Sequence, residues 1–154
     1  MNVIIRNATL ADLPTLRKFE QGVIDTERPM DADLKRDEIH YYDIKELIQS
    51  PTIKMAIAEI DSRLVGCGYA KLQKAKSWHN FDQHAYLGFM YTHPDHRGKV
   101  INSAVVEDLK EWCRSKGVNN LALEVYHNNP GAIRAYEKVG FHPKLVEMRI
   151  DISK

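Results

Sequence analysis

Apolar and polar residues repeat along this chain with two periods, and each period predicts one kind of element. Alternation at every second residue and short apolar runs predict strands at residues 3–5, 53–60, 64–70, 85–91, 121–126 and 146–152. Apolar residues at helical spacing predict four helices, which start after Thr9, near residue 44, near Lys99 and after Asn129. The later part of the chain has the predicted order strand, helix, strand, helix, strand, and further strands precede it. This order indicates a mixed sheet with helices on both faces.

The loop after the fourth predicted strand carries Arg97, Gly98 and Lys99. A helix that begins near Lys99 leaves its first backbone N–H groups without partners inside the helix, and the positive end of its dipole points toward this loop. Helix starts of this kind bind anions. The same residues also fit an ordinary strand-to-helix connection with solvated cations, so the loop alone leaves both interpretations open.

A second well-marked helix follows the fifth predicted strand. Asn129 suits its N-cap, Pro130 its first turn and Gly140 its C-terminal end. Ala132 and Tyr136 fall on one stripe of this helix. Helical spacing by itself would also fit a half-buried core position for Tyr136.

The two elements together resemble the GNAT superfamily of acyl-CoA-dependent N-acetyltransferases. The most specific part is Asn-x-x-Ala-x-x-x-Tyr-x-x-x-Gly-Phe at residues 129–141, and residues 5–12 also look like the first strand and helix start of that superfamily. Where the family has Gln/Arg-x-x-Gly-x-Gly/Ala, this chain has larger residues at both small positions, Val100 and Asn102. The β-branch of Val100 is expected to crowd the cofactor pyrophosphate.

The resemblance implies one α/β domain over residues 1–154, with a mixed, mostly antiparallel sheet that is splayed in the middle and has helices on both faces. It implies acetyl-CoA as acyl donor, direct attack by a primary amine, and Tyr136 as general acid for the departing thiolate. Tyrosine, with a reference pKa of about 10 against about 8.5 for a thiol, is still protonated when the thiolate leaves. The implied cofactor-binding residues are Met90, Tyr91, Thr92, Arg97, Gly98, Lys99, Val100, Ile101, Asn102, Ser103, Asn129, Ala132 and Tyr136.

The general base is less well defined. Residues 84–92 contain no carboxylate, although many members of the superfamily carry one on the corresponding strand. Glu124 is the first candidate, while Glu27, His127 and a water relay remain open.

An acidic excess between residues 25 and 46 bears on the acceptor. Eight carboxylates face four cations there, which leaves four excess negative charges. The segment is either a solvated face or an acid-lined site that attracts a cationic amine. The resemblance implies an amine acceptor on a small molecule, peptide or protein, and the second interpretation makes that acceptor cationic.

Composition narrows the remaining possibilities. The 154 residues carry a formal net charge of +1, which gives no general attraction for nucleic acid or for an anionic membrane. Two cysteines, Cys67 and Cys113, imply neither a disulfide framework nor a zinc motif and are expected to be core thiols. Trp78 and Phe81 are also expected to pack on the core. No apolar run approaches the ~20 residues that span a bilayer, so we expect a cytoplasmic location.

Other functions fit less well. A metal at His93, Asp95 and His96 lacks further ligands at recognisable spacing, so we expect no metal. No glycine pair of the P-loop type precedes Lys99. The main alternative is a catalytically silent acyl-CoA-binding sensor of the same fold, and assembly into a homodimer is left open.

Overall fold

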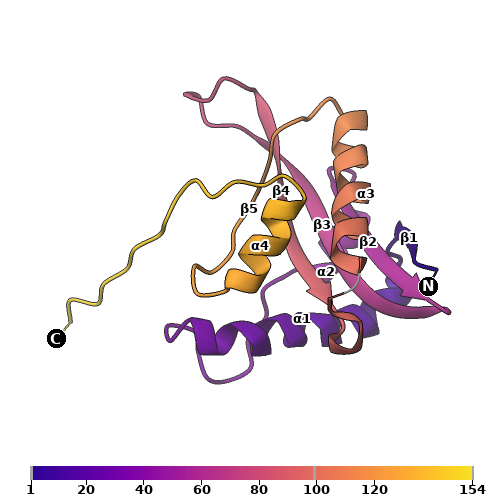
Figure 1. The fold of residues 1–154 in the computed structure, drawn as a ribbon, viewed down its shortest axis with the longest axis horizontal. Coiled ribbons are helices and arrows are strands. Elements are labelled where there is room, and N and C mark those ends of the chain that lie inside the picture. Colours follow the sequence, from indigo (N-terminus) through magenta and orange to yellow (C-terminus); the bar gives the residue numbers. More distant parts are fainter. Residues whose placement is uncertain (1, 99, 154) are drawn as a thin grey trace. The chain divides into compact units, whose positions relative to one another are not determined.

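The computed structural model describes residues 2–98 and 100–153 and contains a five-stranded mixed sheet with helices (Figure 1). The chain divides into two compact units, Met1–Glu124 and Val125–Lys154, and each is described by itself. Among the described residues, no helix is long and apolar enough to cross a membrane.

The sheet belongs to the first unit and has the strand order β1-β2-β3-β4-β5. Neighbouring strands are antiparallel except for β5, which runs parallel to β4. The predicted mixed, mostly antiparallel sheet is therefore confirmed. The strands are β1 (Ile4–Asn7), β2 (Ile53–Ile60), β3 (Arg63–Lys74), β4 (Gln83–Thr92) and β5 (Leu121–Leu123).

The predicted splay lies between β4 and β5. Their pairing runs only from Ala85 opposite Leu121 to Leu87 opposite Leu123, whereas β4 continues to Thr92. The last part of β4 therefore has no β5 partner.

Helices cover both faces of the sheet in the first unit. Met55 of β2 packs in one core cluster with Leu16 of α1 and Leu47 of α2. The preceding residue, Lys54, points to the opposite face, where its Nζ lies 2.9 Å from Asp108 Oδ2 of α3. The helices are α1 (Leu13–Glu27), α2 (Ile44–Gln49), α3 (Ile101–Ser115) and, in the second unit, α4 (Pro130–Lys138), with short 3-10 turns η1 (Leu10–Asp12), η2 (Arg28–Met30) and η3 (Pro94–His96).

Several predicted boundaries need correction. α3 begins at Ile101 with Val100 as its N-cap, whereas the predicted start at Lys99 lies outside the described residues. β5 ends at Leu123, three residues before its predicted end at 126. The hairpin between β2 and β3 turns through Asp61 and Ser62 alone, both with positive φ, which is the conformation that two-residue hairpins favour.

Two predictions about packing were wrong. The predicted strand at 146–152 has no strand structure, and its alternating residues Val146, Met148 and Ile150 are exposed. Alternation marks a sequence that suits a sheet, but a strand forms only beside a partner edge. Trp78 is 78% exposed in the loop between β3 and β4, where Phe81 stacks on His79 at 4.9 Å rather than joining the core. Cys67 and Cys113 are buried, as predicted.

An ionic cluster ties the start of the chain to the sheet. Arg6 of β1 donates from Nη1 and Nη2 to the two carboxylate oxygens of Asp12, at 2.9 Å each, and from Nε to Glu59 of β2 at 2.8 Å. Asp12 also accepts the backbone N–H of Thr9 at 2.7 Å, and the two residues form a capping box. The Arg6 guanidinium holds the pKa of the Asp12 carboxyl below its usual range.

Asp12→Asn should lower the free energy of unfolding at pH 7 by about 1–3 kcal/mol, because it removes one of the two carboxylates, Asp12 and Glu59, that bind Arg6. Since the folded pKa of Asp12 is depressed, its contribution is present above its unfolded pKa of 3.8 and is lost as pH falls through the lower folded value. Urea unfolding at pH 7 and at several values below pH 4 should show a smaller acid-induced loss in the variant. Asp25→Asn, at an exposed position of α1, is the control, and an equal effect there would contradict the assignment.

Candidate functional site

β4 contains one extra residue just beyond the point where its pairing with β5 ends. Cys67 of β3 pairs with Tyr91 and Tyr69 pairs with Gly88, so Phe89 and Met90 together lie opposite Gly68. This is a β-bulge, and such bulges bend a strand and end its pairing beside functional sites. Phe89 has φ 53°, a left-handed conformation that costs about 1–2 kcal/mol for a residue with a Cβ.

Contacts on both faces of the sheet hold the bulge. The Cys67 thiol donates to the Phe89 carbonyl at 3.4 Å. On the α3 face, a Cβ at Gly68 would lie 2.4 Å from Met90 Sδ, so the glycine leaves room for that side chain. On the α1 face, the Phe89 ring stacks on Tyr42 with centroids 4.4 Å apart and an interplanar angle of 16°. Phe89 is only 2% exposed.

The end of β4 that has no β5 partner carries three of the predicted cofactor residues, Met90, Tyr91 and Thr92. Tyr91 and Thr92 pair with β3 on one side, but no β5 residue pairs with β4 beyond Leu87. Backbone groups on that open side can bind an extended chain in the way that an added strand binds a sheet edge.

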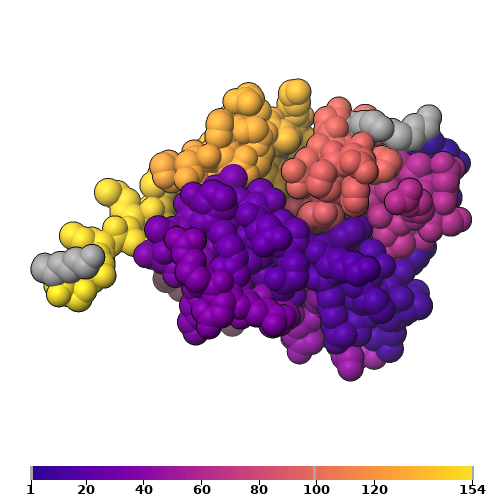
Figure 2. Space-filling model, turned by 90° about the horizontal axis from the view of Figure 1, so that it is seen from below, coloured from indigo at the N-terminus to yellow at the C-terminus, as the bar shows by residue number. Residues whose placement is uncertain are grey.

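The predicted anion-binding loop follows directly. Arg97 donates from Nε to the Thr92 carbonyl at 3.2 Å, and Gly98 adopts φ 79°, which suits glycine. Val100 caps α3 without a side-chain hydrogen bond to the first turn, so the helix start keeps N–H groups for an anion. Figure 2 shows the surface of η3 beside that of α1 on one side of the first unit.

The other loop residues lie in or beside this helix start. Asn102 and Ser103 are in the first turn of α3, and Ser103 Oγ donates to the Val100 carbonyl at 3.0 Å. Ile101, however, is fully buried, so its side chain contributes to the core and only its backbone can face a ligand. Lys99 lies outside the described residues.

Carboxylates and tyrosines gather on the α1 face of the sheet near the splay. Glu124 follows the last paired residue of β5 and accepts the Tyr86 hydroxyl at 2.8 Å. The Tyr86 ring lies 6.4 Å from that of Tyr69, whose hydroxyl lies over Gly88 and would be 2.5 Å from a Cβ there. Burial, and then the hydrogen-bonded Glu124, raise the pKa of Tyr86, which keeps it protonated as a donor to this carboxylate.

Glu27, at the C-terminal end of α1, faces the same group of tyrosines. Burial raises the pKa of Glu27, a hydrogen bond from Tyr41 opposes this shift, and nearby Asp31 adds to it. The charge of Glu27 in turn contributes to the raised pKa values of Tyr42 and Tyr86. Two carboxylates from distant parts of the sequence therefore act on one cluster of rings.

The second unit contains the remaining predicted residues. Asn129 Oδ1 accepts the backbone N–H of Ala132 at 3.2 Å, which confirms the predicted N-cap of α4. Tyr136 lies on α4 and meets Phe141 in an edge-to-face contact with centroids 6.0 Å apart. His127 is exposed in the loop before α4.

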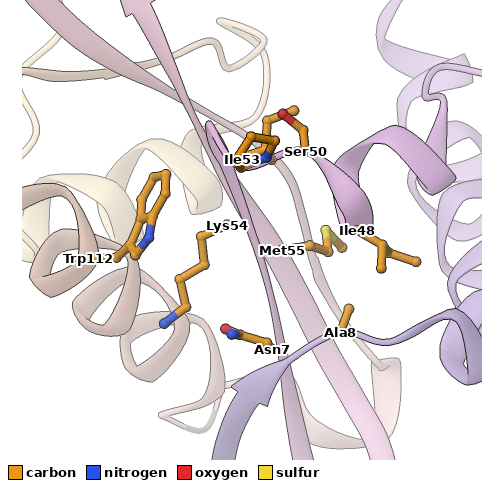
Figure 3. A pocket seen from close by; sticks show the side chains of 9 residues that line it. Asn7, Ala8, Ile48, Ser50, Ile53, Lys54, Met55 and Trp112 are labelled. Atoms are coloured by element: carbon orange, nitrogen blue, oxygen red, sulfur yellow. The ribbon is translucent and has the colours of Figure 1, made fainter. Parts of the chain in front are cut away.

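A separate pocket of about 280 Å³ opens at the start of β2, between α2 and α3 (Figure 3). Its charged lining group, Lys54, is already paired with Asp108, and Met55 and Trp112 supply apolar walls. It contains none of the predicted site residues. Among the described residues, no three His, Cys, Asp or Glu side chains are grouped so that they could hold a metal ion.

The model of the acetyltransferase (GNAT) family matches residues 17–141, which is most of the chain. The chain belongs to this family.

Sequence relatives and solved structures agree with the family. Streptothricin acetyltransferase of Escherichia coli is 31% identical over 84 residues, which are 54% of this chain and 44% of that protein. The chain spans less than half the length of the curated relatives it matches.

Two solved structures share the fold at low sequence identity. A mutant BH1408 protein from Bacillus halodurans has a TM-score of 0.86 at 17% identity, covering 97% of this chain and 99% of its own. A predicted acetyltransferase from Clostridium acetobutylicum, solved with acetyl-CoA, has a TM-score of 0.73 at 15% identity and covers 98% of this chain and 97% of its own.

Sequence reasoning missed the bulge and the residues around it. Phe89 lies inside a continuous apolar run that gives no sign of a register shift. Gly68 and Gly88 are the one local signal, because glycine inside a strand often marks a bulge or a close approach. Tyr42 and Tyr69 reach Phe89 and Gly88 from other strands and loops, and no local pattern predicts this.

Val100→Gly should tighten acetyl-CoA binding, because Val100 is 63% exposed at the helix start and its branched Cβ would crowd the pyrophosphate. Stability should not fall, since Val100 is the N-cap and glycine is preferred over valine there. Titration calorimetry and a thermal melt measure the two quantities. A folded variant with unchanged or weaker affinity would mean that the loop already accommodates valine.

Proposed function

We propose that this protein is an N-acetyltransferase that moves an acetyl group from acetyl-CoA to a primary amine by direct attack. The observation that carries the proposal is the bulge at Phe89, next to the end of β4 that has no β5 partner. After the short turn η3, α3 begins without a side-chain cap. Use of acetyl-CoA is supported by the similar Clostridium acetobutylicum structure that contains it.

On the donor side, we assign backbone groups of Met90, Tyr91 and Thr92 to the pantetheine arm. A backbone N–H at the bulge would stabilise the oxyanion that develops when the amine attacks the thioester carbonyl. The pyrophosphate would bind over the segment 97–103. In the second unit, the likeness to the family assigns Asn129 and Ala132 to cofactor binding. Tyr136 would protonate the departing thiolate.

On the acceptor side, we assign Glu124 as the general base. It stands at the fork of the splayed strands, and Tyr86 holds its carboxylate through one oxygen at 2.8 Å, which leaves the second oxygen for an amine proton. Direct attack requires a neutral amine, so a carboxylate at this place would remove the proton of an incoming ammonium or of the zwitterionic intermediate.

The same arrangement supports a cationic acceptor. Glu27 adds a second negative charge beside Tyr42 and Tyr86, and aromatic rings also attract cations through their faces. Asp31, in contrast, is buried and accepts the backbone N–H of Asp33 at 3.0 Å. We therefore assign it to stabilising a turn and not to binding the amine substrate. From the acidic segment 25–46 we therefore assign Glu27, whose charge acts on Tyr42 and Tyr86, to a second positive charge of the acceptor.

Turnover separates this enzyme from a silent acyl-CoA sensor of the same fold. Thiol release from acetyl-CoA should be measured with 1,4-diaminobutane, lysine amide, glycine amide, glucosamine, glutamate and streptothricin, followed by mass analysis of the products. We expect acetylated products, with the dications favoured over glutamate. Tight acetyl-CoA binding with no acetylated product from any amine would support the sensor.

Glu124→Gln should lower kcat/KM for the best amine by about 10²–10⁴-fold, because a base is lost. Glu27→Gln should instead raise the KM of a dication and change kcat little, because it removes uniform binding. Acetyl-CoA affinity is the control for both variants. Similar effects of the two substitutions on kcat would contradict the separate roles.

Tyr136→Phe removes only a hydroxyl and keeps the ring that meets Phe141. If Tyr136 is the general acid, kcat should fall by about 10²–10⁴-fold while acetyl-CoA affinity stays nearly intact. Steady-state kinetics should be combined with a pre-steady-state check that chemistry is rate-limiting. A near-normal kcat under that condition would return Tyr136 to a packing role.

A further inference from the structure

The segment between η2 and α2 is fastened to α1 by a buried carboxylate. Glu20 of α1, whose side chain is 2% exposed, accepts the backbone N–H groups of Tyr41 at 2.9 Å and Tyr42 at 2.8 Å through Oε2. Its Oε1 lies 3.1 Å from His40 Nδ1. The neighbouring Gln21 donates from Nε2 to the Ile39 carbonyl at 3.1 Å. Residues 39–42 are thus held on α1 by the backbone of Ile39, Tyr41 and Tyr42 and by the side chain of His40.

The fastened segment carries one ring to the bulge. Tyr42 stacks on Phe89 at 4.4 Å and meets Tyr69 edge to face at 6.1 Å. Phe89 is an aromatic residue with positive φ, and such a conformation persists only where the surroundings over-determine it. The Tyr42 ring is a constraint of that kind, because the backbone N–H groups of Tyr41 and Tyr42 both donate to Glu20.

We propose that Tyr42 is a positioning residue, held by Glu20, which keeps Phe89 in its left-handed conformation and so sets the backbone of the bulge. It acts through Phe89 and touches neither the thioester nor the amine. The consequence is that residues 39–42, which lie on the acceptor side, determine the geometry of backbone groups on the donor side. The effect of Tyr42 on catalysis rests on the proposed function, whereas its effect on the backbone of the bulge rests on the contacts alone.

Three variants separate the ring, the hydroxyl and the anchor. Tyr42→Leu keeps apolar volume but removes the stacked ring, Tyr42→Phe keeps the ring, and Glu20→Gln weakens the anchor. Cys113→Ala removes a buried side chain from α3 and reports what lost stability does by itself. All four are made in the full chain and compared with the unaltered protein.

The structural readout is amide hydrogen exchange of the protein without ligand. Exchange at Phe89, Met90 and Tyr91 should be about 10-fold faster or more in Tyr42→Leu, intermediate in Glu20→Gln, and within about threefold of the unaltered protein in Tyr42→Phe and Cys113→Ala. Equal exchange in Tyr42→Leu and Tyr42→Phe, or equal acceleration in Cys113→Ala, would overturn the proposal.

The catalytic readout uses acetyl-CoA and the amine of the panel that is acetylated fastest. In Tyr42→Leu, kcat should fall by about 10-fold or more, because a misplaced bulge misaligns the reacting groups, while the Kd of coenzyme A stays within about threefold. A rise in amine KM alone would reduce Tyr42 to an acceptor contact. If the unaltered protein acetylates no amine, the proposed function fails, and the exchange data still decide the role of Tyr42.

Discussion

The stacking of Tyr42 on Phe89 connects the segment before α2 to the bulge in β4. Phe89 occupies a left-handed conformation that an aromatic residue does not favour by itself, and it does so at the one place where β4 has an extra residue. The ring from Tyr42 on one side and the Cys67 thiol on its carbonyl hold it there. Without the bulge, β4 would continue as a regular strand, and its backbone groups would stay in register with β3.

Two consequences of the bulge coincide in space. It lies just beyond the last paired residues of β4 and β5, so the strands separate and leave one side of β4 open. It also lies beside Gly88, where the Tyr69 ring covers the strand and Tyr86 holds Glu124. The open strand edge that we propose for the donor and the carboxylate that we propose for the acceptor therefore both lie near the bulge, and strained backbone of this kind is often found at functional sites.

What the sequence could predict depends on how far apart the interacting residues lie along the chain. The Asn129 cap, the capping box of Thr9 and Asp12, the end of α2 at Ser50 and the strands of the sheet all follow from local signals, and the structure has them. The bulge does not, because the run around Phe89 is apolar throughout and its partners come from distant segments. The strand predicted at 146–152 was wrong for the opposite reason. Its alternating residues suit a strand, but the segment has no partner strand among the described residues.

The central claim is that the thioester end of acetyl-CoA binds along β4 beyond Leu87 while its pyrophosphate binds at the start of α3. Backbone amide shifts in an ¹⁵N-labelled sample, titrated with acetyl-CoA and then with a pyrophosphate-containing fragment that lacks the pantetheine arm, test it most directly. The claim predicts that acetyl-CoA shifts the amides of Met90, Tyr91 and Thr92 together with those of Asn102 and Ser103, whereas the fragment shifts only the second group. Saturable acetyl-CoA binding that leaves the β4 amides unmoved would contradict it.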